Sequence, residues 1–104
     1  MHKVEITGVD TSKLKTLSQT EMTNLLLEVK NGDMKAREKM IQGNLKLVLS
    51  VLKRFNDKKE SLDDLFQVGC IGLMKAIDNF DLSHNVKFST YACPMIIGEI
   101  RRHL

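Results

Sequence analysis

The sequence predicts an all-α fold, a compact bundle of about five helices that follows an irregular N-terminal arm. Three observations lead to this prediction. Residues that interrupt helices are few, with six glycines and one proline among 104 residues, and they divide the chain into helix-length pieces. Apolar residues recur at spacings of three and four within these pieces. Short polar residues that can cap helices precede several of them.

The chain divides into an arm, residues 1–17, and a helical part, residues 18–104. Apolar residues in the arm show no helical period, so we expect it to be irregular. Ser18 and Glu21 form a capping-box pattern that starts the first helix. It ends at Gly32, where a left-handed residue is expected.

Asp33 caps the second helix, which extends to Gly43 and completes a leading pair, residues 18–43. The remaining part, residues 44–104, begins with a third helix over residues 45–52. That segment is apolar nearly all round, so we expect it to be the central, most buried helix.

Ser61 caps a fourth helix, which contains Gly69 and Gly72. Glycine lowers helix propensity by about 1 kcal/mol relative to alanine, so we explain both glycines by the close approach of a neighbouring helix. Ser89 is expected to cap a fifth helix that reaches the end of the chain. Pro94 falls in its second turn, removes a backbone hydrogen bond and is expected to bend it.

The composition is typical of one soluble globular domain. Hydrophobic residues make up 42% and charged residues 28% of the chain, a balance that excludes a disordered protein. No apolar run approaches the roughly 20 residues of a membrane span. The net charge of +3 permits an anionic partner without requiring one. Cys70 and Cys93 belong to no paired motif, so we expect reduced thiols in a cytoplasmic protein.

The sequence contains no constellation that favours an enzyme. The histidines are far apart in sequence, and neither cysteine has the spacing of a metal site. Asp63 and Asp64 are neighbours, so they point to different sides of a helix. We therefore expect no catalytic residues, no bound metal, no cofactor and no small-molecule substrate.

A mixture of aromatic and basic residues lies between Phe80 and Arg102, including three of the five aromatic residues of the chain. Cationic side chains bind phosphates, and flat rings stack on unpaired bases with roughly 1–3 kcal/mol per base. The mixture favours capture of single-stranded nucleic acid. Burial of Phe80 and Phe88 in the core is an alternative that the sequence leaves open.

Three strings resemble region two of the bacterial RNA polymerase sigma factors of the sigma-70 class. They are residues 44–48 (NLKLV), 64–76 (DLFQVGCIGLMKA) and 87–92 (KFSTYA), in the order and spacing of that family. Residues 4–14 and 94–102 are similar to members of the family that act in sporulation. The resemblance implies the all-α fold of that region and a role in transcription initiation.

The resemblance also implies two partners, RNA polymerase core and promoter DNA. It places the fourth helix on a coiled coil of the large clamp subunit, with polymerase contacts from Asp64, Gln67 and Val68. Val68 stands where housekeeping members have an acidic residue, so the contact there is expected to be apolar or altered.

For the DNA, the resemblance implies capture of the melted non-template strand of the promoter −10 element. One flipped base, an adenine, would be surrounded by Phe80, Lys87, Phe88 and Tyr91, with Tyr91 stacked on it. A second flipped base would lie against Asn44, Leu47, Ser89 and Thr90. The upstream edge of the element would be read by Gly98, Arg101 and Arg102.

Two departures from the family affect these expectations. The two adjacent tryptophans of housekeeping members are replaced by Pro94 and Met95, so we expect weaker melting of the duplex. Region two of the family continues past Leu104, so we expect either a piece of a longer protein or a shortened one.

Two alternatives remain at this stage. The first is a truncated chain that acts as a protein-interaction module and is sequestered by an anti-sigma factor, with the arm and residues 18–43 as the partner surface. The second is an unrelated helical protein that reads the major groove of duplex DNA.

Overall fold

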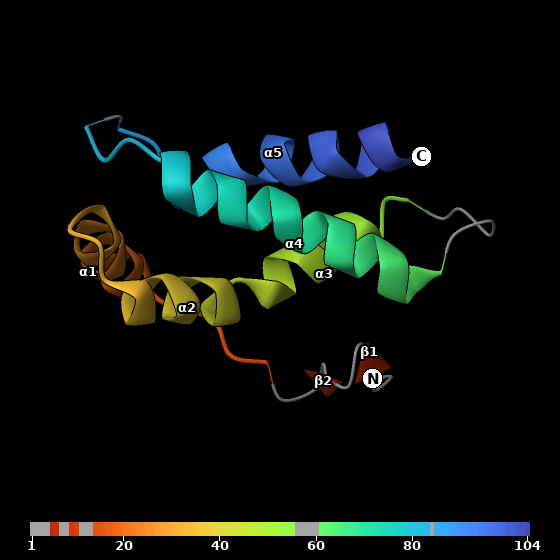
Figure 1. Ribbon diagram of the computed structural model, residues 1–104, viewed down its shortest axis with the longest axis horizontal. Helices are drawn as coiled ribbons and strands as arrows, with labels where there is room; N and C mark the ends of the chain where they lie inside the picture. Colours follow the sequence, from red (N-terminus) through yellow and green to blue (C-terminus); the bar gives the residue numbers. More distant parts are fainter. Residues whose placement is uncertain (1–4, 7–8, 11–13, 56–60, 84) are drawn as a thin grey trace.

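The computed structural model describes residues 5–6, 9–10, 14–55, 61–83 and 85–104. The helices of this part of the chain are α1 (Gln19–Lys30), α2 (Met34–Gly43), α3 (Leu45–Leu52), α4 (Leu62–Asn79) and α5 (Phe88–His103). They pack around one hydrophobic core (Figure 1). The prediction of an all-α bundle of about five helices is confirmed.

Local side chains begin and end the first two helices as the sequence predicts. The Ser18 hydroxyl accepts the Glu21 N–H at 3.1 Å, and the Glu21 carboxylate accepts the Ser18 N–H at 3.0 Å. Gly32 has a φ of 86°, the left-handed conformation that glycine adopts at low cost. The Asp33 carboxylate then accepts the N–H groups of Lys35 and Ala36, which caps α2.

The central helix is α4, and the prediction that residues 45–52 would take this place is wrong. α4 contacts each of the other four helices, and it lies between α5 on one side and α2 and α3 on the other (Figure 1). α3 buries Leu45, Val48, Val51 and Leu52. With only eight residues, however, it spans much less of the bundle than the 18-residue α4. Apolarity predicts burial correctly here, but it does not predict position.

Two glycines allow α4 to approach its neighbours closely, as predicted. A Cβ atom at Gly72 would lie 2.7 Å from the Cα atom of Ile96 and 2.7 Å from the carbonyl oxygen of Met95, both in α5. A Cβ atom at Gly69 would lie 2.7 Å from the Val48 side chain of α3. The backbones of α4 and α5 therefore meet where α4 has no side chain.

The fifth helix begins two residues earlier than predicted. Its first residue is Phe88, its N-cap is Lys87, and Lys87 makes no side-chain capping bond. Ser89 therefore lies in the first turn and is not the cap. The reason is tertiary packing, because the Phe88 side chain is buried at the start of the helix. Pro94 lies inside α5 without ending it.

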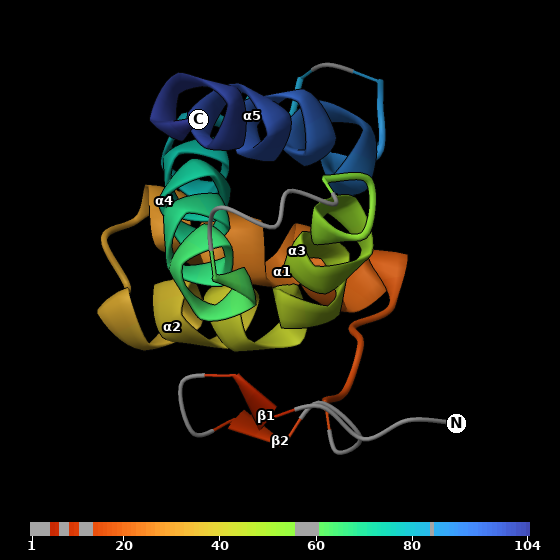
Figure 2. The ribbon, with the colours of Figure 1, turned by 90° about the vertical axis from the view of Figure 1, so that its right-hand side faces the viewer.

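The arm contains two short strands that the sequence analysis did not predict. β1 (Glu5–Ile6) and β2 (Val9–Asp10) pair in an antiparallel ladder, Glu5 opposite Asp10 and Ile6 opposite Val9. Two-residue strands are too short to show an alternating pattern, which is why the arm reads as irregular. Figure 2 shows this pair below the helices, and β1 contacts α4.

Candidate nucleic-acid interface

The three aromatic residues of the predicted site form one cluster. Phe80 is the C-cap of α4, Phe88 begins α5, and Tyr91 follows one turn later. The Phe80 and Phe88 ring centroids are 5.5 Å apart, and those of Phe80 and Tyr91 are 5.4 Å apart, both in edge-on arrangements. The loop between α4 and α5 thus brings the rings together.

The members of this cluster differ in exposure. Phe80 is 3% and Phe88 is 1% exposed. In the free chain these two rings are therefore part of the core, which is the alternative that the sequence left open. Tyr91 is half-buried. Tyr91 thus keeps part of its surface exposed while its ring contacts Phe80.

A small cavity of about 180 Å³ reaches the two buried rings from the side of α1. Phe80 and Phe88 line it, and the loop before α5 supplies part of the wall. The other lining residues are Gln19, Met22, Thr23, Leu26, Leu82, Asn85 and Val86. The buried rings are therefore not sealed on every side.

Polar residues of the predicted site lie around the start of α5. Lys87 and Thr90 are exposed, and Ser89 is half-buried. Asn44 is buried, and its amide nitrogen donates to the Met40 carbonyl at 2.8 Å. Leu47 is half-buried on α3, which packs against α5.

The last turns of α5 carry the cationic part of the predicted site. Arg101 and Arg102 are exposed, and Gly98 is half-buried one turn earlier. Arg102 donates to the Glu99 carboxylate at 2.7 Å, and Lys75 of α4 donates to the same oxygen. These hydrogen bonds, the one from Lys75 first, lower the pKa of Glu99.

Sequence reasoning did not identify Glu99 or Lys75. They are 24 positions apart in sequence, and no short pattern can indicate such a pairing. The one local signal is the spacing of Glu99 and Arg102, since a carboxylate three residues before a cation forms an ion pair on a helix.

The residues predicted for polymerase contact lie on α4. Asp64 and Gln67 are exposed and Val68 is half-buried. Ile71, one turn beyond Gln67, is 43% exposed although apolar. Positions 64, 67 and 71 share one face of a helix, so the face combines polar groups with an exposed apolar side chain. Sequence reasoning missed Ile71.

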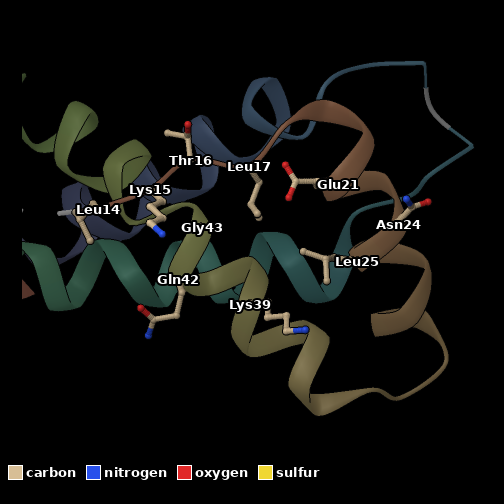
Figure 3. Close-up of a pocket in the computed structure, with 10 residues that line it drawn as sticks. All are labelled: Leu14, Lys15, Thr16, Leu17, Glu21, Asn24, Leu25, Lys39, Gln42 and Gly43. Carbon is tan, nitrogen blue, oxygen red and sulfur yellow. The ribbon is translucent and has the colours of Figure 1, made fainter.

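A second groove lies elsewhere, between the segment before α1 and the helices α1 and α2. It encloses about 610 Å³. Leu14, Leu17 and Leu25 supply apolar surface, and Leu17 occupies the space beside Gly43. Figure 3 shows the lining residues, which also include Lys15, Thr16, Glu21, Asn24, Lys39 and Gln42.

Other chemistry finds little support in the described part of the chain. No group of three His, Cys, Asp or Glu side chains is arranged there to hold a metal ion. Cys70 and Cys93 are free thiols, and burial raises the pKa of Cys70 to about 11, which makes it a poor nucleophile. Among these same residues, no helix is long and apolar enough to cross a membrane.

Comparison with known proteins identifies the family. The profile described as Sigma-70 region 2 matches residues 40–104. The chain is 68% identical over 104 residues to the RNA polymerase sigma-G factor of Clostridium acetobutylicum and 69% identical over 104 residues to that of Bacillus subtilis (strain 168). It is 51% identical over 88 residues, 85% of its length, to the RNA polymerase sigma-F factor of Bacillus subtilis, of which it covers 34%.

The match covers essentially the whole chain but only 40% of each of these two sigma-G factors. Sigma factors are transcription initiation factors and not enzymes, so the expectation that the chain is no enzyme is confirmed. The resemblance to the sporulation members is confirmed as well. The chain belongs to the sigma-70 family of RNA polymerase sigma factors, and it carries region 2 of that family.

Proposed function

We propose that the chain acts in transcription initiation by binding RNA polymerase core and capturing the melted non-template strand of the promoter −10 element. The observation that carries the DNA part is Tyr91, a half-buried residue whose ring packs edge-on against Phe80. Family membership supports the polymerase part. The free thiols of Cys70 and Cys93 agree with a cytoplasmic protein.

The proposed capture balances two energies of similar size. Removing a base from the stack costs a few kcal/mol, and stacking on an aromatic side chain returns roughly 1–3 kcal/mol. Tyr91 is suited to this task because its inner contact with Phe80 keeps the ring in place before a base arrives. Phe80 and Phe88 then act as buried residues. They support Tyr91 and line the small cavity.

Cationic and polar side chains on both sides of Tyr91 supply the remaining contacts. Lys87 lies before it, and Arg101 and Arg102 lie after it on the same helix. All three are exposed, so they can bind phosphates in a salt-dependent manner. For the second base, Asn44, Leu47, Ser89 and Thr90 are proposed because α3 packs against α5.

The proposed polymerase contact uses the outer face of α4. Asp64 and Gln67 supply polar groups, and Val68 and Ile71 supply apolar surface. The proposed partner is the coiled coil of the large clamp subunit. The Ser61 hydroxyl caps α4 at the Asp64 N–H, 3.0 Å away, which fixes the start of this face.

The DNA part is tested with Tyr91→Ala and a single-stranded, A/T-rich oligonucleotide at low salt. Loss of the ring is expected to weaken binding by roughly 1–3 kcal/mol, measured by fluorescence anisotropy. Tyr91→Phe keeps the ring and is expected to bind nearly as well as wild type. Equal binding by wild type and Tyr91→Ala, or a preference for the same sequence as duplex, would contradict single-strand capture.

The polymerase part is tested by retention of RNA polymerase core on the immobilised chain. Gln67→Ala is expected to reduce retention, because it removes a polar group from the middle of the proposed face. Gln42→Ala, an exposed glutamine of α2, is the matched control and is expected to retain core as wild type does. Wild type that retains no core would rule out the docking proposal.

A second candidate function rests on the groove between the segment before α1 and the helices α1 and α2. Its leucines and its volume of about 610 Å³ suit an apolar segment of another protein. We propose an anti-sigma factor as that alternative partner. Binding of such a protein together with no affinity for the oligonucleotide would favour this function over DNA capture.

A further inference from the structure

We infer that Glu99 is a positioning residue that holds Arg102 ready for DNA at the upstream edge of the captured strand. The inference rests on the proposed function and adds a residue that the site prediction did not contain. Glu99 lies on α5 with its side chain 13% exposed. Its carboxylate accepts a hydrogen bond from Lys75 of α4 and one from Arg102 at 2.7 Å.

Gly98 completes the arrangement around Arg102. A Cβ atom built on Gly98 would lie 3.5 Å from one terminal nitrogen of the Arg102 guanidinium and 3.8 Å from the other. The guanidinium thus lies over the bare backbone of Gly98 while Glu99 holds one of its nitrogens. The two neighbouring residues together restrict a side chain that otherwise has many rotamers.

Restricting Arg102 before DNA arrives lowers the entropy lost when DNA binds. The restraint leaves further N–H donors of Arg102 available for DNA, because arginine has five such donors and the Arg102 side chain is 67% exposed. Lys75, on the other side of the carboxylate, is 54% exposed. One carboxylate between two cations leaves a net positive charge, and both cations can still reach a phosphate.

The sign of the charge makes the inference testable. A carboxylate on a DNA-binding surface repels phosphates, so removing its charge strengthens binding if repulsion is its only effect. Removing the same charge weakens binding if the carboxylate positions Arg102. Simple electrostatics and positioning therefore predict opposite results for Glu99→Gln.

The test compares Glu99→Gln with Glu38→Gln in the full chain. Glu38 is an exposed carboxylate of α2, so its variant has the same change in net charge at a distant place. The probe is a forked oligonucleotide whose duplex ends at an A/T-rich single strand. Glu38→Gln is expected to bind it as well as wild type or slightly better, and Glu99→Gln about threefold more weakly.

A double-mutant cycle separates positioning from a general effect on the fold. In the Arg102→Ala background, Glu99→Gln is expected to have no further effect on affinity, because the side chain that it positions is gone. Arg102→Ala itself is expected to lower the salt slope of binding by about one. Glu99→Asp retains the charge and is expected to recover part of the affinity.

Each outcome bears on the inference. Binding by Glu99→Gln that equals or exceeds that of Glu38→Gln overturns the positioning role and leaves the proposed function standing. The same follows if Glu99→Gln weakens binding equally with and without Arg102. A wild-type chain without affinity for the forked oligonucleotide overturns both the proposed function and the inference.

Discussion

The two ends of the helical bundle are held together by different means. α4 and α5 meet at Gly72, where no side chain separates the helix backbones. α1 and α2 stand on either side of a groove of about 610 Å³, with Leu26 as the one buried residue of α1. The difference indicates that the relative position of α4 and α5 is held more firmly than that of α1 and α2. The pair α4 and α5 carries the aromatic cluster and the proposed partner faces.

The leading pair depends more on polar contacts at its ends. A capping box starts α1, and Asp33 caps α2. Arg37 of α2 forms a two-pronged ion pair with Asp78 near the end of α4, at 2.8 and 2.9 Å. Such contacts near the surface contribute less than buried packing does, and three substitutions test the contrast.

The largest expected effect is that of Phe88→Ala. This side chain is almost fully buried and packs on Phe80, so its removal is expected to lower the free energy of unfolding by about 3–5 kcal/mol. Tyr91→Ala should cost less, because Tyr91 is half-buried. Urea unfolding measures both variants, and equal losses would contradict the division into supporting and exposed rings.

A smaller effect is expected from Gly72→Ala, with Gly98→Ala as its control on α5. The new methyl group at position 72 would meet the backbone of Ile96 and Met95, so we expect a loss of about 1–3 kcal/mol in the free energy of unfolding. At position 98 the nearest atom is 3.5 Å away, and alanine is favoured over glycine in a helix by up to about 1 kcal/mol. If Gly72→Ala and Gly98→Ala shifted the temperature of thermal unfolding in the same direction, the result would refute the backbone contact.

The smallest effect concerns the Arg37–Asp78 pair and its dependence on pH. Hydrogen bonds from Arg37 lower the pKa of Asp78 below its ordinary value. The stabilisation is therefore complete above the unfolded pKa of about 3.9 and is lost as the pH falls through the lower pKa of the folded protein. Both side chains are partly exposed, so the contribution is expected to be below about 1 kcal/mol.

Unfolding of wild type and Asp78→Asn across this pH range measures the contribution. The difference between them is expected to be constant near neutral pH and to vanish in acid. Glu38→Gln, at an exposed carboxylate of the same helix as Arg37, provides the control. A difference that persists at the lowest pH would mean that Asp78 acts through packing rather than charge.

Short-range chemistry made much of the fold predictable. The capping box at Ser18, the left-handed Gly32 and the cap at Asp33 each involve residues within three positions of one another, so the sequence displays them directly. Gly72 was predictable because a glycine inside a long helix requires a packing reason. The start of α5 was misplaced because the burial of Phe88, and not the capping ability of Ser89, decides it.

The sequence indicates some residues of the candidate site but not their geometry. Aromatic residues between Phe80 and Tyr91 are visible in the sequence, yet nothing there shows which rings are buried. That depends on α1 and on Leu82, Asn85 and Val86, which line a cavity together with Phe80 and Phe88. Lys75 and Glu99 meet only because α4 and α5 pack side by side.

The missing side chain at Gly72 has a consequence for how the two proposed partners are arranged. The Gly72 backbone lies against that of Ile96. Because position 72 has no side chain, no change of side-chain rotamer there can alter the angle between α4 and α5. Under the proposed function, polymerase binds α4 of this helix pair and promoter DNA binds α5. Docking on polymerase then also orients the DNA. A shift of register between enzyme and template would require the contact between α4 and α5 to separate.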